Sequence, residues 1–331
     1  MNLVTGATGH IGNVLVRELI ARNKPVRALI MPGEDRTPLN DLPVSIIEGD
    51  VLDATSLQKA LQGVEMVYHL AGMISIMPGR NDLLRTVNIL GTRNILFACY
   101  QAGVRRLVYT SSIHALSCPP QGIMIDEHIP FDPEHATNDY GYSKAQASLE
   151  VKRAAEQGLD AVIVCPTGVI GPYDFRRSEL GQIILDCLQY KPQFFVEGAY
   201  DFVDVRDVAR GMILAGEKGK KGETYILSGE KLTVRNIIDA VRTISGRRFA
   251  RLKVPFSLAC FAAKFTTIYS RLTHLRPRFT PCSLETLASN ADISHAKAQK
   301  ELGYIPRPLF ESLRDTVAWF LENRHLFGLR A

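Results

Sequence analysis

Two patterns of hydrophobic and polar positions take turns along the chain up to about residue 171. Short apolar runs bounded by Gly, Pro, Asn or Asp predict buried strands. Between these runs, apolar residues recur three and four positions apart, which predicts helices that bury one face. Strands that alternate with helices predict a parallel sheet covered on both faces. The predicted strands lie at residues 2–4, 26–30, 44–47, 66–72, 106–112 and 161–165, and the predicted helices at 11–20, around 57–61, at 87–96 and at 140–157.

The alternation weakens in the rest of the chain. Residues 172–200 mix Pro, aromatic and charged residues, while 201–209 predict a strand that leads into a helix capped by an aspartate. We therefore expect an α/β protein with a Rossmann-type, doubly wound parallel sheet and a smaller C-terminal α/β substrate domain. The predicted dinucleotide-binding domain covers 1–171, with 201–218 returning to it, and the predicted substrate-binding domain covers 172–200 and 219–331.

One segment near the C-terminus, residues 254–265, is strongly apolar and has lysines at its edges. Three interpretations remain open for this segment. It forms the core of the small domain, it lines an apolar substrate pocket, or it is a helix that docks on a membrane surface. The first interpretation is favoured, because most apolar runs in globular proteins are buried.

Composition narrows the class of protein. The chain has 331 residues, of which 46% are hydrophobic and 22% charged, as in an ordinary globular protein. The net charge of +5 comes without a dense run of Lys and Arg interleaved with aromatics, so nucleic-acid binding is not expected. The six cysteines have no paired spacing, which argues against a metal site or a disulfide framework and favours a cytoplasmic location. We expect neither a signal peptide nor a membrane-spanning helix, since the first strand begins at once and no apolar run is long enough.

Residues 5–12, TGATGHIG, are the strongest chemical signal. They follow a predicted strand and open a predicted helix, which is the context that a dinucleotide-binding turn requires. Gly6 lets the strand turn sharply, Gly9 lets backbone N–H groups approach a pyrophosphate, and Gly12 lets the helix pack close to the sheet. The pyrophosphate would lie at the N-terminus of the helix, where unpaired N–H groups favour an anion.

The choice between NAD and NADP depends on the residues after the second strand, where the adenosine ribose is expected. Met31 stands directly after this strand, and Glu34, Asp35 and Arg36 come slightly later. No basic residue follows the strand immediately, which favours NAD over NADP. Asp50, after the third strand, faces the adenine amino group or is an ordinary turn residue.

Tyr140 and Lys144 are four residues apart on a predicted helix and therefore share a face. A tyrosine with its usual pKa of about 10 is a poor base at neutral pH, and a neighbouring ammonium is expected to lower that pKa. Ser112 follows a predicted strand at the edge of the sheet where ligands of open α/β sheets bind. Ser112 would hydrogen-bond the reacting oxygen, or it would only cap a turn.

These motifs together resemble the extended short-chain dehydrogenase/reductase family, and the resemblance covers nearly the full chain. The details are similar to dihydroflavonol-4-reductase-like and 3β-hydroxysteroid-dehydrogenase-like members of the epimerase/dehydratase superfamily. The residues that carry the resemblance are Thr5 to Gly12, Gly49 to Val51, Leu70 to Gly72, Val87 and Asn88 with Gly91 and Thr92, Tyr109 to Ser112, Tyr140 to Lys144, Pro166 to Val169, Asp201 to Ala209, and the tail from Ser294 to Tyr304 with Trp319 and Phe320.

The resemblance implies roles for particular residues. Tyr140 would be the general acid/base, Lys144 its tuner and a ribose ligand, and Ser112 the ligand of the substrate oxygen. A homodimer is also a family-level expectation. The residues expected to bind the cofactor are Gly6, Thr8, Gly9, His10, Ile11, Gly12, Met31, Arg36, Asp50, Val51, Leu70, Ala71, Gly72, Asn88, Thr110, Tyr140, Lys144, Pro166, Thr167, Gly168 and Val169.

Two departures from the family pattern matter. Reductases of this group often carry an arginine where Met31 stands, so the resemblance does not support NADP. Sugar dehydratases of the wider family place acids beside the catalytic hydroxyl, whereas Ile113 and His114 follow Ser112 here. His114 itself binds substrate or relays a proton near Ser112, or it is a loop histidine whose ring is satisfied by the backbone.

The leading hypothesis is an NAD(P)-dependent oxidoreductase that interconverts a secondary alcohol and a ketone or aldehyde of a moderately apolar small molecule. A nucleotide-sugar epimerase that retains NAD through a transient ketone would use the same three side chains. A non-catalytic protein that only senses the cofactor is the third hypothesis, and the Tyr140–Lys144 pair argues against it.

Overall fold

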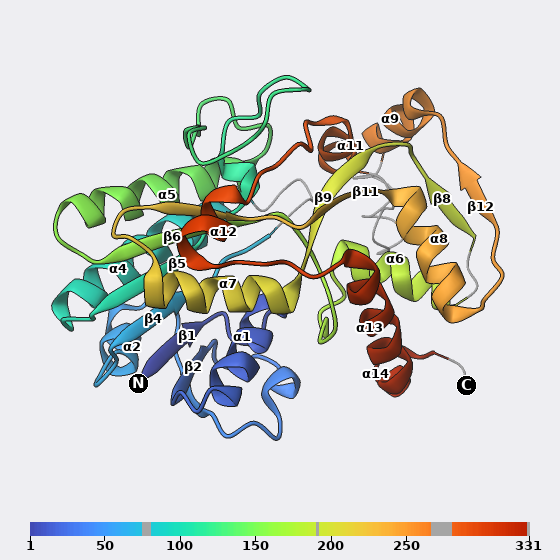
Figure 1. Ribbon diagram of the computed structural model, residues 1–331. Helices are drawn as coiled ribbons and strands as arrows, with labels where there is room; N and C mark the ends of the chain where they lie inside the picture. The colour runs from blue at the N-terminus through green and yellow to red at the C-terminus, as the bar shows by residue number, and fades with distance from the viewer. Residues whose placement is uncertain (75–80, 190–191, 266–279, 330–331) are drawn as a thin grey trace.

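The computed structural model of the chain describes residues 1–74, 81–189, 192–265 and 280–329. At its centre is a seven-stranded sheet in the order β10-β6-β5-β4-β1-β2-β3, in which every neighbouring pair is parallel (Figure 1). This architecture confirms the predicted Rossmann-type fold. The strands are β1 (Asn2–Thr5), β2 (Val26–Ile30), β3 (Ser45–Glu48), β4 (Met66–His69), β5 (Arg106–Thr110), β6 (Ala161–Pro166) and β10 (Thr224–Leu227).

Two hydrophobic clusters cover the two faces of this sheet. Along β1, Leu3 belongs to one cluster and Val4 to the other, as expected because successive side chains of a strand point to opposite faces. One face carries α1 (His10–Ala21) and α7 (Val205–Lys218), which pack against each other. The other carries α2 (Ala54–Ala60), α4 (Gly91–Gln101) and α5 (Asp139–Glu156).

Polar caps fix where several helices begin. The Asp53 carboxylate accepts from the backbone N–H groups of Thr55 and Ser56 at the start of α2. Asn138 caps α5, and Asp204 caps α7 in the way predicted for the 201–209 stretch. The predicted strands at 66–72 and 106–112 are shorter than expected, and the predicted helix at 87–96 begins as a π-helical segment, η2 (Thr86–Leu90), before α4.

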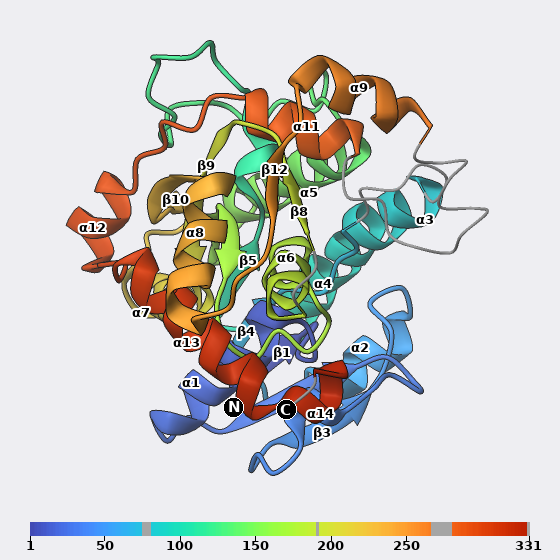
Figure 2. The ribbon, with the colours of Figure 1, turned by 90° about the vertical axis from the view of Figure 1, so that its right-hand side faces the viewer.

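The C-terminal region contains two small sheets. One has the order β11-β9-β7, formed by β11 (Glu230–Thr233), β9 (Ala199–Asp204) and β7 (Gly168–Ile170), and the other pairs β8 (Gln193–Phe195) with β12 (Arg251–Lys253). Figure 2 shows β8 and β12 on the side that carries α9. The helices are α6 (Glu179–Leu188), α8 (Val234–Ser245), α9 (Phe256–Lys264), α11 (Pro281–Ala288), α12 (Ala296–Leu302), α13 (Leu309–Glu322) and α14 (Arg324–Phe327).

The sheet topology differs from the predicted domain boundaries at two strands. Strand β10 was predicted within the substrate-binding range 219–331, but it pairs with β6 in the main sheet. Strand β9 was predicted to return with 201–218, but it pairs with β7 and β11, and only α7 packs on α1 and the main sheet. A short strand carries no sequence signal for the partner that it joins, which explains both differences.

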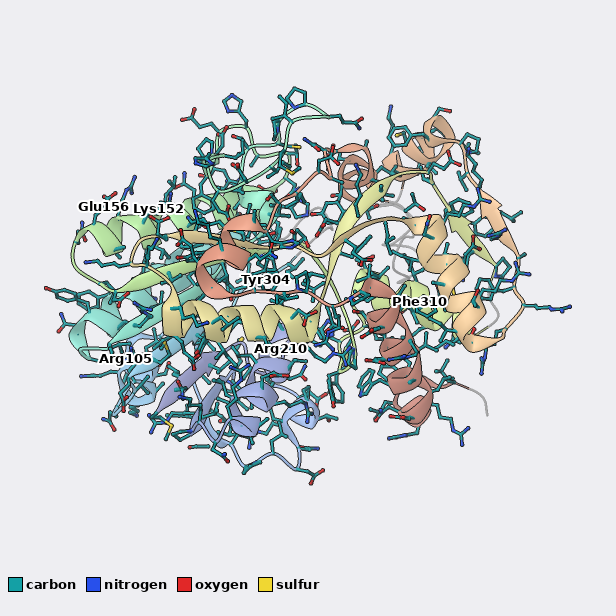
Figure 3. The ribbon with its side chains drawn as sticks, viewed as in Figure 1. Arg105, Lys152, Glu156, Arg210, Tyr304 and Phe310 are labelled. Atoms are coloured by element: carbon teal, nitrogen blue, oxygen red, sulfur yellow. The ribbon has the colours of Figure 1, made fainter. Side chains whose placement is uncertain are left out.

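The chain beyond α12 is tied back to α7 by charged and polar contacts. Arg307 donates to the buried Asp207 carboxylate over 2.9 Å, and Arg206 bridges Asp204 and Asp315 of α13. Tyr304, labelled in Figure 3, is buried and donates a hydrogen bond to the carbonyl of Ser228. Buried carboxylates keep their charge only with such partners, so loss of either arginine would leave a buried carboxylate without its partner and destabilise this junction.

The apolar segment 254–265 does not form the core that its composition favoured. Within α9 only Ala259 and Ala263 are buried, against Val196 and Leu284. The larger side chains of the segment, including Leu258 and Phe261, are exposed. The prediction of a buried core segment is therefore wrong, because apolar composition alone does not say which face of a short helix points inward.

Candidate active site

The glycine-rich turn between β1 and α1 has no room for side chains at two of its glycines. A Cβ on Gly12 would lie 2.1 Å from the carbonyl oxygen of Gly6, and a Cβ on Gly6 would lie 2.8 Å from the backbone nitrogen of Ala71. Gly6 also has a φ of +67°, in the left-handed region that favours glycine. The turn thus packs against Leu70 and Ala71, just after β4, which brings together two of the predicted cofactor-binding segments.

The N-terminus of α1 suits a phosphate group. Its cap residue, Gly9, offers no side-chain hydrogen bond, and no acidic residue occupies the first turn. Helices α2, α5 and α7 instead begin with a capping side chain. Uncapped N–H groups and the helix dipole favour an anion, so the residues present fit the pyrophosphate of a dinucleotide.

A carboxylate stands beside the turn, just beyond β2. Glu34 accepts hydrogen bonds from the Thr8 hydroxyl over 2.7 Å and from the Met31 backbone N–H over 3.0 Å. Arg176 also donates to Thr8 and pairs with Glu34. The structure also gives the surroundings of three further residues that were predicted to bind the cofactor. The His10 ring contacts the carbonyl of Pro172, the Met31 side chain is exposed, and Arg36 pairs with Glu48.

Asp50 stabilises the turn that follows β3. One of its carboxylate oxygens accepts from the backbone N–H of Leu52 over 2.9 Å. This contact is the one expected if Asp50 is an ordinary turn residue. Val51 is buried beneath α4, where it lies close to Gly91.

A chain of buried hydrogen bonds links the turn to helix α5. The Thr5 hydroxyl contacts His69 Nδ1 over 2.8 Å, and His69 Nε2 contacts the Thr92 hydroxyl over 3.2 Å. Thr92 donates to the carbonyl of Asn88, and the Asn88 amide donates to the Ser143 hydroxyl. Burial lowers the pKa of His69 to about 3, so its ring is neutral at pH 7. This network holds the glycine turn and α5 in a fixed relation.

Ser112, Tyr140 and Lys144 converge as the sequence predicts. The Ser112 hydroxyl faces Tyr140 and lowers the pKa of its phenol, and it accepts a hydrogen bond from the backbone N–H of His114 over 3.2 Å. Ser112 therefore caps the turn η3 (Ile113–Ala115) as well as facing the tyrosine, and its contact with a substrate oxygen stays a prediction. Lys144 is buried, and its ammonium donates to the carbonyl of Thr110 over 2.7 Å. Gly72 brings the end of β4 close to that ammonium.

The pKa values of the tyrosine and lysine differ from the sequence expectation. Burial raises the pKa of Tyr140 to about 12, although the hydrogen bond with Ser112 acts in the opposite direction. Burial lowers the pKa of Lys144 to about 8. The expectation that the ammonium lowers the tyrosine pKa is not met, because desolvation of the phenolate is the largest effect. Tyr140 is a neutral proton donor at pH 7.

His114 lies against Tyr140, but the hydrogen-bond partner of its ring is another tyrosine, Tyr200. Its ring stacks on Tyr200 with centroids 5.8 Å apart, and its Nε2 lies 3.1 Å from the Tyr200 hydroxyl. The ring also meets Tyr140 edge-on, with centroids 6.4 Å apart. Burial lowers the pKa of His114, so the ring is neutral at pH 7. The predicted backbone partner is thus replaced by a side chain of β9.

A buried carboxylate lies behind residues 166–169, which were predicted to bind the cofactor. Asp201 accepts from the Thr167 hydroxyl over 2.6 Å and from the backbone N–H of Gly229 over 2.9 Å. Burial raises the pKa of Asp201 to about 6. Pro166 ends β6, while Gly168 and Val169 belong to β7, which pairs with β9. Asp201 therefore joins the main sheet to the smaller one.

Three residues with direct contacts in this region were missed by sequence reasoning as site residues: Glu34 as the partner of Thr8, Arg176 and Tyr200. Arg176 and Tyr200 come from parts of the chain that carry no motif. Glu34 and Tyr200 had local signals, since Glu34 lies shortly after the second predicted strand and Tyr200 directly precedes the 201–209 stretch.

Comparisons with known proteins agree on the family and the fold. The model of the NAD dependent epimerase/dehydratase family matches residues 2–228. "Sterol demethylase protein B" of Methylococcus capsulatus is 39% identical over 97% of this chain and 98% of its own length. A "Putative dihydroflavonol 4-reductase" of Synechocystis is 34% identical over 98% of this chain and 95% of its own. The solved structure of gox2253 is 35% identical, with a TM-score of 0.85 over 98% of both chains.

Proposed function

Because the chain belongs to the NAD dependent epimerase/dehydratase family, we propose that it is an NAD-dependent reductase acting on a ketone or aldehyde of an apolar small molecule. The observation that carries the proposal is the convergence of Ser112 and Tyr140, with the buried Lys144 one turn along α5. This arrangement lies at the carboxyl edge of a parallel sheet, beside a turn that fits a dinucleotide.

The chemistry divides between the cofactor and the protein. A bound nicotinamide supplies the hydride that reduces the carbonyl carbon. Ser112 holds the carbonyl oxygen, and Tyr140 donates its phenolic proton to that oxygen. A tyrosine with a pKa of about 12 is well suited to donate in this direction, since it is protonated at neutral pH. Lys144 places a positive charge beside the phenolate that forms.

Two observations support a reductase, the first against a nucleotide-sugar epimerase and the second against a sugar dehydratase. Two relatives, at 39% and 34% identity, carry names of sterol or flavonol chemistry, which favours an apolar substrate. The residues after Ser112 are Ile113 and His114, and His114 is neutral and engaged with Tyr200. No acid follows the serine, as the dehydratase pattern would require.

The test of the proposal is the variant Tyr140→Phe, assayed for cofactor-dependent reduction of a panel of apolar ketones and aldehydes. Loss of the proton donor should lower kcat by about 10³-fold or more, while NADH binding is unchanged. Tyr142→Phe is the matched control, because Tyr142 faces Arg85 rather than Ser112. Full activity of Tyr140→Phe would refute the assignment. A stoichiometric NAD that does not exchange, with a thermal shift by UDP-sugars, would favour the epimerase instead.

We further infer a preference for NAD from the position of Glu34. Its carboxylate stands between Thr8 of the glycine turn and the end of β2, where an acid accepts from a ribose 2′-hydroxyl and repels a 2′-phosphate. Fluorescence titration should give tighter binding of NADH than of NADPH, by about 10-fold or more. Equal affinities, or tighter NADPH binding with Arg176 as the phosphate partner, would contradict this preference.

A further inference from the structure

Helix α9 presents its largest apolar side chains outward. Leu258 is 56% exposed and Phe261 is 60% exposed, and Phe265, just beyond the helix, packs edge-on against Phe261 with ring centroids 5.3 Å apart. The inward face consists of Ala259 and Ala263. A surface helix ordinarily buries its large apolar residues and exposes polar ones. The order is reversed in α9, which indicates that another apolar phase covers this face.

The apolar surface continues on the neighbouring pair of strands. Leu252 of β12 is the register partner of Phe194 of β8, so the two side chains share a face, and both are exposed. Figure 1 shows β12 leading directly to α9, and the backbone N–H of Val254 donates to Phe195 between them. We call the exposed set Phe194, Leu252, Leu258, Phe261 and Phe265 the α9 surface.

Positive charge is concentrated in the stretch of chain that contains β12 and α9. From residue 240 to the end of the described stretch at 265 there is no Asp or Glu, whereas there are six Lys or Arg. An open hollow beside β12 is lined by Arg242, Arg247, Arg248 and Arg251, with Asp239 as its one acid. Arg251 pairs with Asp239, and Lys253 pairs with Glu197. Arg242, Arg248 and Lys264 have no ion pair with any acid among the described residues, so their charge is available.

We propose that the α9 surface docks on the surface of an anionic lipid bilayer. Leu258, Phe261 and Phe265 enter the boundary between headgroups and acyl chains, and the surrounding cations bind lipid phosphates. Attachment is peripheral, since no helix in the described residues combines the length and the apolarity needed to cross a bilayer. This docking is separate from the proposed reductase chemistry and does not depend on it.

Charge decides between a bilayer and a second copy of the chain. A two-fold interface brings the same patch of both subunits together, so the cations of this region would face each other. An anionic bilayer instead offers negative charge and an apolar interior at the same place. Exposed phenylalanine and leucine beside unpaired arginines complement that combination better than they complement another protein copy.

The test is sedimentation of the full-length protein with vesicles of phosphatidylcholine, alone or mixed with phosphatidylglycerol. The wild type should sediment with the mixed vesicles and far less with the neutral ones. Leu258→Glu with Phe261→Glu should lower the bound fraction by about 10-fold or more, because two charges must then enter the interface. Arg242→Gln with Arg248→Gln should weaken binding to mixed vesicles only. Ile305→Glu, at a residue 74% exposed elsewhere on the chain, should bind as the wild type does.

A second pair of variants measures insertion directly. The single native tryptophan, Trp319, is buried, so it adds a constant background. Phe261→Trp should shift its emission to the blue when mixed vesicles are added, while Ile305→Trp should not. NADH binding and circular dichroism establish that each variant is folded, and turnover of a water-soluble carbonyl reports on the proposed reductase function separately.

Several outcomes would overturn the docking. These are wild-type protein that does not sediment with mixed vesicles, a glutamate pair that binds as well as the wild type, and no blue shift of Phe261→Trp. Binding that inorganic phosphate abolishes completely would assign the arginine hollow to a free anion. A wild-type dimer that the glutamate pair converts to monomer would assign the α9 surface to a second copy of the chain.

Discussion

Small residues have opposite structural roles at the glycine turn and in helix α9. At the turn, Gly6 and Gly12 bring two backbone segments so close that one added carbon would collide with them. In α9, Ala259 and Ala263 face the protein so that phenylalanine and leucine can face away from it. The first region is organised around its own backbone, and the second around an exposed surface. The comparison shows that the glycine turn accepts almost no added side-chain volume, whereas the proposed role of α9 depends on which side chains it exposes.

The largest effect that follows from this comparison is expected for Gly12→Ala. The new Cβ would meet the Gly6 carbonyl at 2.1 Å, so the turn has to move. We expect a loss of about 2–4 kcal/mol in the free energy of unfolding. Because the same movement displaces the N-terminus of α1, NADH affinity should also fall by about 100-fold or more. Calorimetry and fluorescence titration measure the two quantities.

Gly246→Ala is the matched control in the C-terminal region. Gly246 ends α8 with a φ of +65° and has nothing within 4 Å of its ideal Cβ, so only the backbone conformation opposes the alanine. We expect a loss of about 1 kcal/mol and unchanged NADH affinity. Equal losses of affinity in the two variants would break the distinction between the regions.

The same distinction explains what the sequence could predict. The glycine turn, the Asp53 and Asp204 caps and the Ser112–Tyr140–Lys144 set were predictable, because each depends on local spacing along one strand or helix. Contacts such as Glu34 with Arg176 were not, because they join residues more than a hundred positions apart.

Burial was the other quantity that the sequence left open. The raised pKa of Tyr140 results from desolvation by surrounding parts of the chain, not from its neighbour Lys144. The outward face of α9 has the same origin, since a short apolar helix does not itself show which side the fold will cover. In both cases the tertiary environment decides the property, and local spacing carries no information about it.

Asp201 tests the junction between the main sheet and the small sheet β11-β9-β7, and the expected effect is smaller and depends on pH. The folded protein holds the proton of this carboxyl up to about pH 6, whereas the ordinary pKa is 3.8. Between these values the unfolded chain has already released the proton, so stability falls as the pH rises from about 4 to 6 and the loss is complete above that window. The total is on the order of 2 kcal/mol.

Asp201→Asn should remove this pH dependence, because the amide oxygen can accept from Thr167 and Gly229 without ever becoming charged. The difference in Tm between variant and wild type should therefore shift in favour of the variant by several degrees between pH 4 and pH 7. Other carboxylates titrate in both proteins and cancel in this difference. Asp292→Asn, which removes an exposed partner of Lys231, should leave the profile parallel to that of the wild type. A difference in Tm that is constant across the range would mean that Asp201 is ionised in the folded protein over this whole range. The junction between the two sheets would then be formed by a charged carboxylate and not by a protonated one.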